Sequence, residues 1–130
     1  MPRKKIIEKK EKSDESVHLL IRDIHNFLTD RKVKDIVILD LCEVHSYFKF
    51  FIIGTAMSTL HLSSTVRQMQ KNFADRLPQK HSGYRSDDIE SGWVIIDFAD
   101  PLVHLFLEDE RQYYNLERLW GDARVYKFSE

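Results

Sequence analysis

The stretch that decides the fold is WVIIDFADPLVHLFL, residues 93–107. It contains two apolar runs of strand length, Trp93–Phe98 and Leu102–Leu107, separated by Ala99-Asp100-Pro101. Runs of four to eight β-favouring residues divided by a short polar turn are typical of an antiparallel hairpin. The stretch therefore predicts two adjacent, antiparallel strands.

Three other segments have the spacing of amphipathic helices. Ser13 precedes two carboxylates and a stripe of apolar residues over Val17–Leu28, which predicts a helix capped at Ser13. Ser58 is the expected N-cap of a second helix, with its apolar stripe over Leu62–Leu77. Glu108–Trp120 is predicted as a single third helix.

Further apolar runs have the length of strands. Ile36–Leu41 is nearly continuous in apolar and β-branched residues, which is typical of a strand covered on both faces. Phe48–Gly54 is predicted as the next strand and Arg124–Phe128 as a short last one, whereas the polar stretch Gln79–Gly92 is predicted to be a mobile loop. The order α-β-β-α-β-β-α-β predicts an α/β fold: a single layered domain with a mixed β-sheet and packed helices.

Length and composition are those of a soluble globular domain. The chain has 130 residues, of which 42% are hydrophobic and 32% charged, and single domains commonly have about 100–150 residues. The longest apolar runs last four residues, whereas a membrane-spanning helix needs about twenty, so we expect no membrane partner. Cys42 is the only cysteine. We expect a buried, reduced thiol there, which makes a cytoplasmic location the default.

Charge is distributed unevenly along the chain. Residues 1–12 hold six basic and two acidic side chains, a net charge of +4, and are predicted as a basic flexible tail before a folded domain over 13–130. The remainder carries −5, and residues 87–122 alone carry −8. Such an acidic surface favours a basic protein partner over direct contact with phosphate. For the tail, a solvated terminus and a weak contact with nucleic acid both stay open.

Support for catalysis is weak. Asp97 and Asp100 flank the hairpin turn, but their spacing of three points them to opposite faces of a strand, so we expect turn and capping residues. Gly54-Thr55 lacks the lysine and the repeated glycines of phosphate-binding loops. The histidines and Cys42 lack the spacing of zinc ligands. We predict no catalytic residue, no metal and no cofactor, with a nucleotidyltransferase-like enzyme or nucleotide-binding domain as the alternative.

Aromatic and acidic side chains concentrate near the C-terminus. Tyr113, Tyr114 and Trp120 lie among five carboxylates, Glu108, Asp109, Glu110, Glu117 and Asp122. Tyr and Trp are frequent anchors at interfaces because they bury a large area and keep one polar group. Considered apart from this cluster, Trp120 is more typical of a core residue that packs with Leu116 and Leu119. The cluster as a whole predicts a docking surface rather than a catalytic cleft.

Two parts of the chain resemble the Iojap-like ribosomal silencing factors. The first part is DIVILD at 35–40, then SYFKFFIIGT at 46–55 with Ser58. The second and more specific part is WVIIDFAD at 93–100, VHLF at 103–106 and RQYYNLERLWGDA at 111–123. The resemblance spans residues 16–123 and implies a nucleotidyltransferase-like fold that lacks the catalytic acids.

The function that this resemblance implies is binding. Such factors bind large-subunit ribosomal protein fourteen at the subunit-joining face of the large ribosomal subunit, block association with the small subunit and so repress translation. They also act late in large-subunit maturation and are commonly homodimers when free. Together with the acidic and aromatic cluster, the resemblance points to six partner-binding residues: His104, Tyr113, Tyr114, Glu117, Trp120 and Asp122. From its strand position, His104 is either partly exposed or a hydrogen-bonded core histidine.

Three positions depart from the pattern of that family. Lys49 stands where the family usually has Asp, and Ala56 and Ala99 stand where it usually has Gly. Lys49 reverses a charge. Ala56 weakens the idea of a phosphate-binding turn, because a positive φ costs more for Ala than for Gly.

Overall fold

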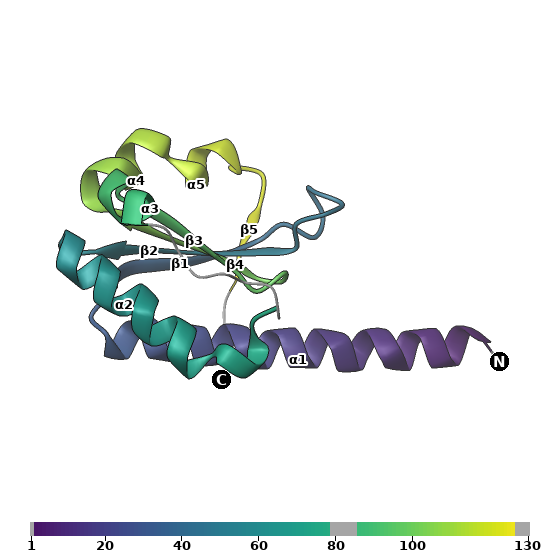
Figure 1. Cartoon of the computed structure of the whole chain (residues 1–130). Helices are drawn as coiled ribbons and strands as arrows, with labels where there is room; N and C mark the ends of the chain where they lie inside the picture. Colours follow the sequence, from purple (N-terminus) through teal and green to yellow (C-terminus); the bar gives the residue numbers. More distant parts are fainter. Residues whose placement is uncertain (1, 79–85, 127–130) are drawn as a thin grey trace.

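A five-stranded mixed sheet forms the middle layer of the domain (Figure 1). The computed structural model describes the backbone of residues 2–78 and 86–126 and the side chains of residues 15–78 and 88–126. In this described part the strands lie side by side in the order β3-β4-β2-β1-β5. Their bounds are β1 (Lys34–Asp40), β2 (Phe50–Ala56), β3 (Trp93–Asp97), β4 (Leu102–Leu107) and β5 (Arg124–Val125).

Strand pairing confirms the predicted hairpin and the mixed sheet. β3 pairs antiparallel with β4, and β1 pairs antiparallel with both β2 and β5, whereas β2 and β4 run parallel. The expectation that residues 36–41 are covered on both faces is confirmed, since Ile36 and Ile38 pack in one hydrophobic core and Val37, Leu39 and Leu41 in a second core on the opposite face. β2 is covered more completely, because all of its residues are buried. The reason is position: β2 lies between two long strands, whereas β1 has only the short β5 on its outer side.

Helices lie on both faces of the sheet (Figure 1). α1 (Pro2–Asp30) and α2 (Thr59–Asn72) cover one face, while α4 (Glu108–Tyr114) and α5 (Leu116–Leu119) lie over the other. The short η1 (Ala74–Arg76) and α3 (Ser86–Ser91) follow α2 in the chain. α3 falls in the stretch predicted as a mobile loop, whose residues 79–85 lie outside the described residues. None of the helices in the described part has the length and apolar composition needed to cross a membrane.

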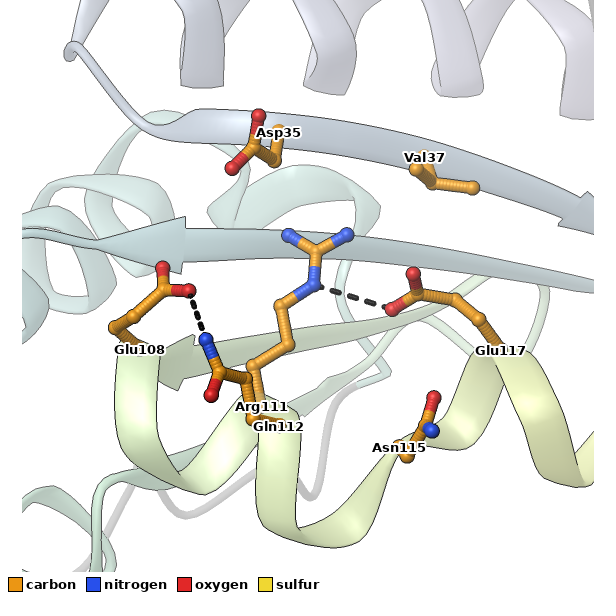
Figure 2. A pocket seen from close by; sticks show the side chains of 7 residues that line it. All are labelled: Asp35, Val37, Glu108, Arg111, Gln112, Asn115 and Glu117. Carbon is orange, nitrogen blue, oxygen red and sulfur yellow. Dashed lines mark hydrogen bonds and ion pairs between the residues drawn. The ribbon is translucent and has the colours of Figure 1, made fainter.

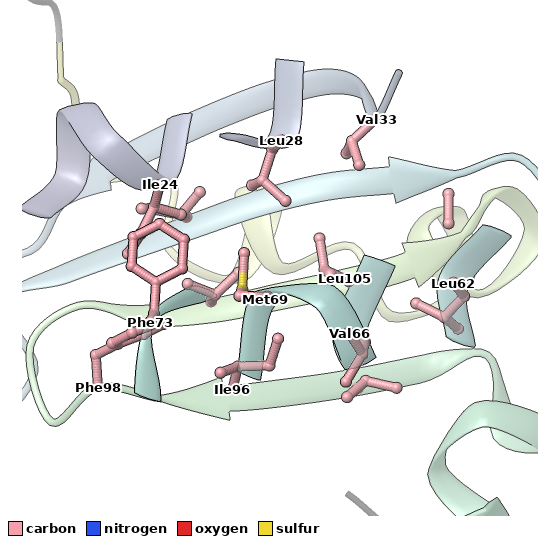
Figure 3. Close-up of a cluster of buried hydrophobic side chains, with 14 of the residues drawn as sticks. Ile24, Leu28, Val33, Leu62, Val66, Met69, Phe73, Ile96, Phe98 and Leu105 are labelled. Carbon is pink, nitrogen blue, oxygen red and sulfur yellow. The ribbon is translucent and has the colours of Figure 1, made fainter. Parts of the chain in front are cut away.

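The larger core lies between the sheet and helices α1 and α2 (Figure 3). Its helical members confirm the two predicted apolar stripes, because they recur every three or four residues and are fully buried: Ile21, Ile24 and Leu28 of α1, and Leu62, Val66 and Met69 of α2. Ser58 caps α2 as predicted, its hydroxyl accepting a hydrogen bond from the His61 N–H at 3.0 Å. A smaller core on the opposite face contains Phe51, Phe106 and Leu116.

Three helix boundaries differ from prediction. α2 ends at Asn72, before Leu77, and the separate turn η1 follows it. α1 begins at Pro2 rather than at Ser13, because the intervening Lys, Arg and Glu residues are good helix formers and no Gly or inner Pro interrupts them. The segment 108–120, predicted as one helix, is divided at Asn115, which has φ 46° and ψ 61°. Asn tolerates this left-handed conformation. Its side chain accepts a hydrogen bond from the Arg118 N–H at 3.3 Å and so begins α5.

Cys42 is exposed, which corrects the expectation of a buried thiol. It follows the end of β1, where the Asp40 carboxylate accepts a hydrogen bond from the Cys42 N–H at 3.0 Å and turns the chain outward. Partial burial of the sulfur and the neighbouring Asp40 carboxylate raise the pKa of Cys42 to about 11. The thiol is therefore protonated at neutral pH, which makes it a poor nucleophile.

Candidate protein-docking surface

Five of the six predicted partner-binding residues lie on the α4–α5 face, which we define as residues 108–122 on the sheet face opposite α1 and α2. Tyr113 is 82% exposed and Tyr114 45% exposed. Asp122 is also exposed, whereas Glu117 and Trp120 are half-buried. The structure thus brings these five residues onto one layer of the domain.

His104 lies beneath this layer, in β4, and only 4% of it is exposed. The Trp93 indole N–H donates a hydrogen bond to its Nδ1 at 3.2 Å, so of the two readings of His104 the hydrogen-bonded core histidine is confirmed. Its Nε2 has no hydrogen-bond partner among the described residues. Burial lowers the pKa of His104 to about 4, which leaves the ring neutral at physiological pH. In this conformation His104 supports the surface from below.

A row of ring contacts connects the predicted aromatic residues across the sheet. Each ring is within 6 Å of the next, a separation at which aromatic pairs attract one another. The centroid distances are 5.8 Å for Trp120–Phe51, 4.5 Å for Phe51–His104, 5.9 Å for His104–Trp93, 4.6 Å for Trp93–Tyr114 and 5.1 Å for Tyr114–Tyr113. These contacts place the buried His104 and the exposed tyrosines in one continuous cluster of rings.

Arg111 fixes α4 and α5 to the sheet (Figure 2). Its Nε donates to Glu117 Oε1 at 3.1 Å, and its Nη1 donates to the Thr55 hydroxyl of β2 at 2.7 Å. Only 10% of its side chain is exposed. A buried cation needs such partners to offset its desolvation. Arg111 was not predicted as a site residue, although one basic residue after a run of three carboxylates was a usable signal.

A pocket of about 410 Å³ opens beside Arg111. Carboxylates of β1, α4 and α5 line it together with the guanidinium, as Figure 2 shows. The lining residues are Asp35, Val37, Glu108, Arg111, Gln112, Asn115 and Glu117. Three carboxylates against one guanidinium give the pocket a negative charge, which extends the acidic character of the α4–α5 face.

The surface also includes apolar residues that the sequence did not single out. Leu119, expected in the core, is 71% exposed, and Tyr47 is 80% exposed. His45 connects the loop of Tyr47 to α5, because its Nδ1 accepts hydrogen bonds from the N–H groups of Tyr47 and Phe48 at 3.0 Å and its ring lies 5.5 Å from that of Trp120. Exposed aromatic and aliphatic side chains of this kind are typical of protein–protein interfaces.

The residues of the enzyme alternative have structural roles here. Asp97 Oδ1 accepts a hydrogen bond from the Ala99 N–H at 2.6 Å, which confirms the predicted turn role. A Cβ on Gly54 would lie 2.6 Å from Val33 Cγ1, so this glycine allows Val33 to pack on β2. The Thr55 hydroxyl bonds to Arg111. Ala56 is the last residue of β2, paired in register with Leu107, so this strand extends two residues beyond the predicted end at Gly54.

The fold and the surface define an α/β domain in which α1 and α2 cover one sheet face, while α4 and α5 on the other face present an aromatic, acidic surface suited to protein docking. The chain belongs to the ribosomal silencing factor family, because the family described as "Ribosomal silencing factor during starvation" matches residues 13–130. This match confirms the resemblance to Iojap-like factors.

Curated proteins and solved structures agree with this family. The chain is 36% identical over 94 residues to the ribosomal silencing factor RsfS of Bacillus subtilis, covering 72% of this chain and 78% of that protein. It is 31% identical over 102 residues to the mouse protein named "Mitochondrial assembly of ribosomal large subunit protein 1", covering 73% of this chain and 42% of that protein. A crystal structure from Bacillus halodurans superposes with a TM-score of 0.68 at 28% identity, covering 85% of this chain and 99% of that one. The Bacillus subtilis and mouse proteins are named as silencing and assembly factors rather than as enzymes.

Proposed function

We propose that this chain is a non-enzymatic, cytoplasmic ribosomal silencing factor. It binds the large ribosomal subunit through large-subunit ribosomal protein fourteen, blocks association with the small subunit by occupying the joining face, and so represses translation. It is a homodimer when free and also acts in large-subunit maturation. Membership of the silencing-factor family carries this proposal, and the name of the mouse relative supports the large subunit as the target.

The α4–α5 face supplies the chemistry that such docking needs. Tyr113 and Leu119 present large exposed areas, and the first turn of α4 holds Glu108, Asp109 and Glu110. Apolar anchors at the centre of an interface provide most of its affinity, whereas charges at its rim speed association and select the partner. An acidic and aromatic surface of this kind fits a basic protein surface. Asp122 is the most C-terminal of the six proposed contacts and is exposed.

The six proposed partner-binding residues divide into three roles. Tyr113, Tyr114 and Trp120 act as anchors, and Glu117 and Asp122 act as charge partners. His104 is a positioning residue, because it holds the Trp93 ring through a hydrogen bond, and that ring lies 4.6 Å from Tyr114.

The test is co-sedimentation of the purified protein with isolated large and small ribosomal subunits, together with a subunit-joining assay. We expect binding to the large subunit alone and a loss of joined ribosomes. Asp122→Lys should weaken binding by about 1–3 kcal/mol, or about 5- to 150-fold, if the carboxylate is desolvated against a cation.

The matched control is Asp75→Lys, which makes the same charge change at an exposed position of η1, away from the α4–α5 face. It should leave affinity unchanged. Absence of binding to either subunit would overturn the proposed function, whereas equal affinities for the two variants and the native chain would remove Asp122 from the interface.

A further inference from the structure

The N-terminal part of α1 extends beyond the body of the domain (Figure 1). Among the α1 side chains that the structure describes, which begin at residue 15, Val17 is the first that packs on the core, and Ile21, Ile24 and Leu28 are fully buried. Helical residues rise 1.5 Å each, so residues 2–16 have a length of about 22 Å. This segment is continuous with the helix that the core holds.

Residues 2–12 of this extension differ from the rest of the chain in charge, and they lie outside the family match. They hold six basic and two acidic side chains, whereas the remaining chain carries −5. The family match begins at residue 13, so this basic segment precedes the region shared with other silencing factors.

We propose that residues 2–12 of α1 form a basic arm that binds the phosphate backbone of ribosomal RNA next to the protein-docking site. This inference rests on the proposed function, since the large subunit supplies the RNA. Two observations support it. Helical continuity with α1 orders the backbone before binding, which lowers the entropy cost of placing the charges. The arm also leaves the domain on the side of α1, so it does not compete with the α4–α5 face for the same partner (Figure 1).

Charge complementarity favours RNA as the partner of the arm over a second copy of this chain. The acidic stretch 87–122 carries −8 and repels phosphate, so the arm is the part of the chain suited to it. The acidic face of a second copy would also attract the arm, but RNA offers one negative charge per nucleotide and releases condensed counterions when it is bound. Because of this counterion release, the affinity for RNA should fall with salt concentration by an amount that can be measured.

The test uses the full chain and a labelled RNA hairpin with an uninterrupted A-form stem, read by fluorescence anisotropy at several salt concentrations. We expect the logarithm of the affinity to fall with the logarithm of the salt concentration by about 0.9 per phosphate contact. The variant Lys5→Gln/Lys9→Gln/Lys12→Gln should reduce that slope by about 2–3 and weaken binding about tenfold or more at low salt. Lys5→Arg/Lys9→Arg/Lys12→Arg should bind like the native chain.

The control is Lys32→Gln/Lys34→Gln/Lys71→Gln, which removes the same charge from three exposed positions of the domain body. It should leave the salt slope unchanged. An equal loss in the control, or an unchanged slope in the arm variant, would overturn the inference. So would loss of self-association in sedimentation velocity with unchanged RNA binding, which would assign the arm to a second copy.

The same variants in the large-subunit assay separate this inference from the proposed function. If the native chain does not bind large subunits, the proposed function fails. If the native chain and the arm variant bind large subunits with the same affinity and salt dependence, the proposed function holds and the RNA contact fails.

Discussion

Acidification should destabilise this protein through one buried histidine. His104 lies 4.5 Å from the Phe51 ring and accepts a hydrogen bond from the Trp93 indole at its Nδ1. Because an indole N–H only donates, Nδ1 is unprotonated and the proton of the neutral ring is on Nε2. A second proton on Nδ1 would remove this bond and place a positive charge in an apolar layer.

The size of the effect follows from the pKa of His104. Burial lowers it from 6.5 to about 4, so between these two values the unfolded chain binds the proton and the folded chain does not. The stability that depends on neutral His104 is therefore complete above pH 6.5 and is lost as the pH falls toward 4. At 1.36 kcal/mol per pKa unit the total is about 3 kcal/mol, of which about 2 kcal/mol is lost by pH 5. This is a large part of the 5–15 kcal/mol that stabilises typical domains.

The assay is urea unfolding of the native chain and of His104→Gln between about pH 7 and about pH 5. The variant keeps a hydrogen-bond acceptor for Trp93 but does not titrate, so its free energy of unfolding should fall about 2 kcal/mol less over this range. The control His25→Gln removes an imidazole from a half-buried position on α1 and should keep the loss caused by His104. A stability difference between the native chain and His104→Gln that stays constant with pH would refute this reasoning.

Two substitutions test the backbone and the packing of the sheet. Ala99 has φ 68°, a conformation that costs a side-chain-bearing residue about 1 kcal/mol relative to glycine, so Ala99→Gly should raise the melting temperature by about 3–5 °C; an unchanged or lower value would contradict the strain at this turn. Gly54→Ala should cost about 1–3 kcal/mol in urea unfolding, because its Cβ would lie 2.6 Å from Val33 Cγ1. Adding Val33→Ala should restore part of that loss, and additive costs of the two changes would show that this contact is not the cause.

The elements of the fold were predictable from local patterns, and their boundaries less so. The hairpin over 93–107 and the stripes of α1 and α2 follow from period and spacing alone, because those residues pack as their periodicity requires. Which strand lies at the centre depends instead on the parallel pairing of β2 with β4. That contact joins residues about fifty positions apart, and no local pattern encodes it.

The candidate surface was predictable in composition but not in geometry. The acidic and aromatic character of residues 108–122 was visible in the sequence, and the structure gathers these residues on one face. The burial of His104 and the exposure of Leu119 were not visible, because burial depends on which elements of the fold pack against a residue. Leu116 and Leu119 both belong to α5, yet Leu116 packs in the smaller core and Leu119 is exposed, a difference that periodicity alone does not predict.

The three departures from the family pattern have unequal physical consequences. Lys49 is exposed, so its charge costs little in the free protein and acts only on what docks nearby. Ala56 is in a regular strand, where Ala fits without a positive φ. Only Ala99 has a left-handed backbone, and there Gly would relieve strain. The sequence shows where a chain departs from its family, but the backbone angle decides which departure costs stability. By this criterion the strain is stored in the β3–β4 turn, beside the strands that carry Trp93 and His104.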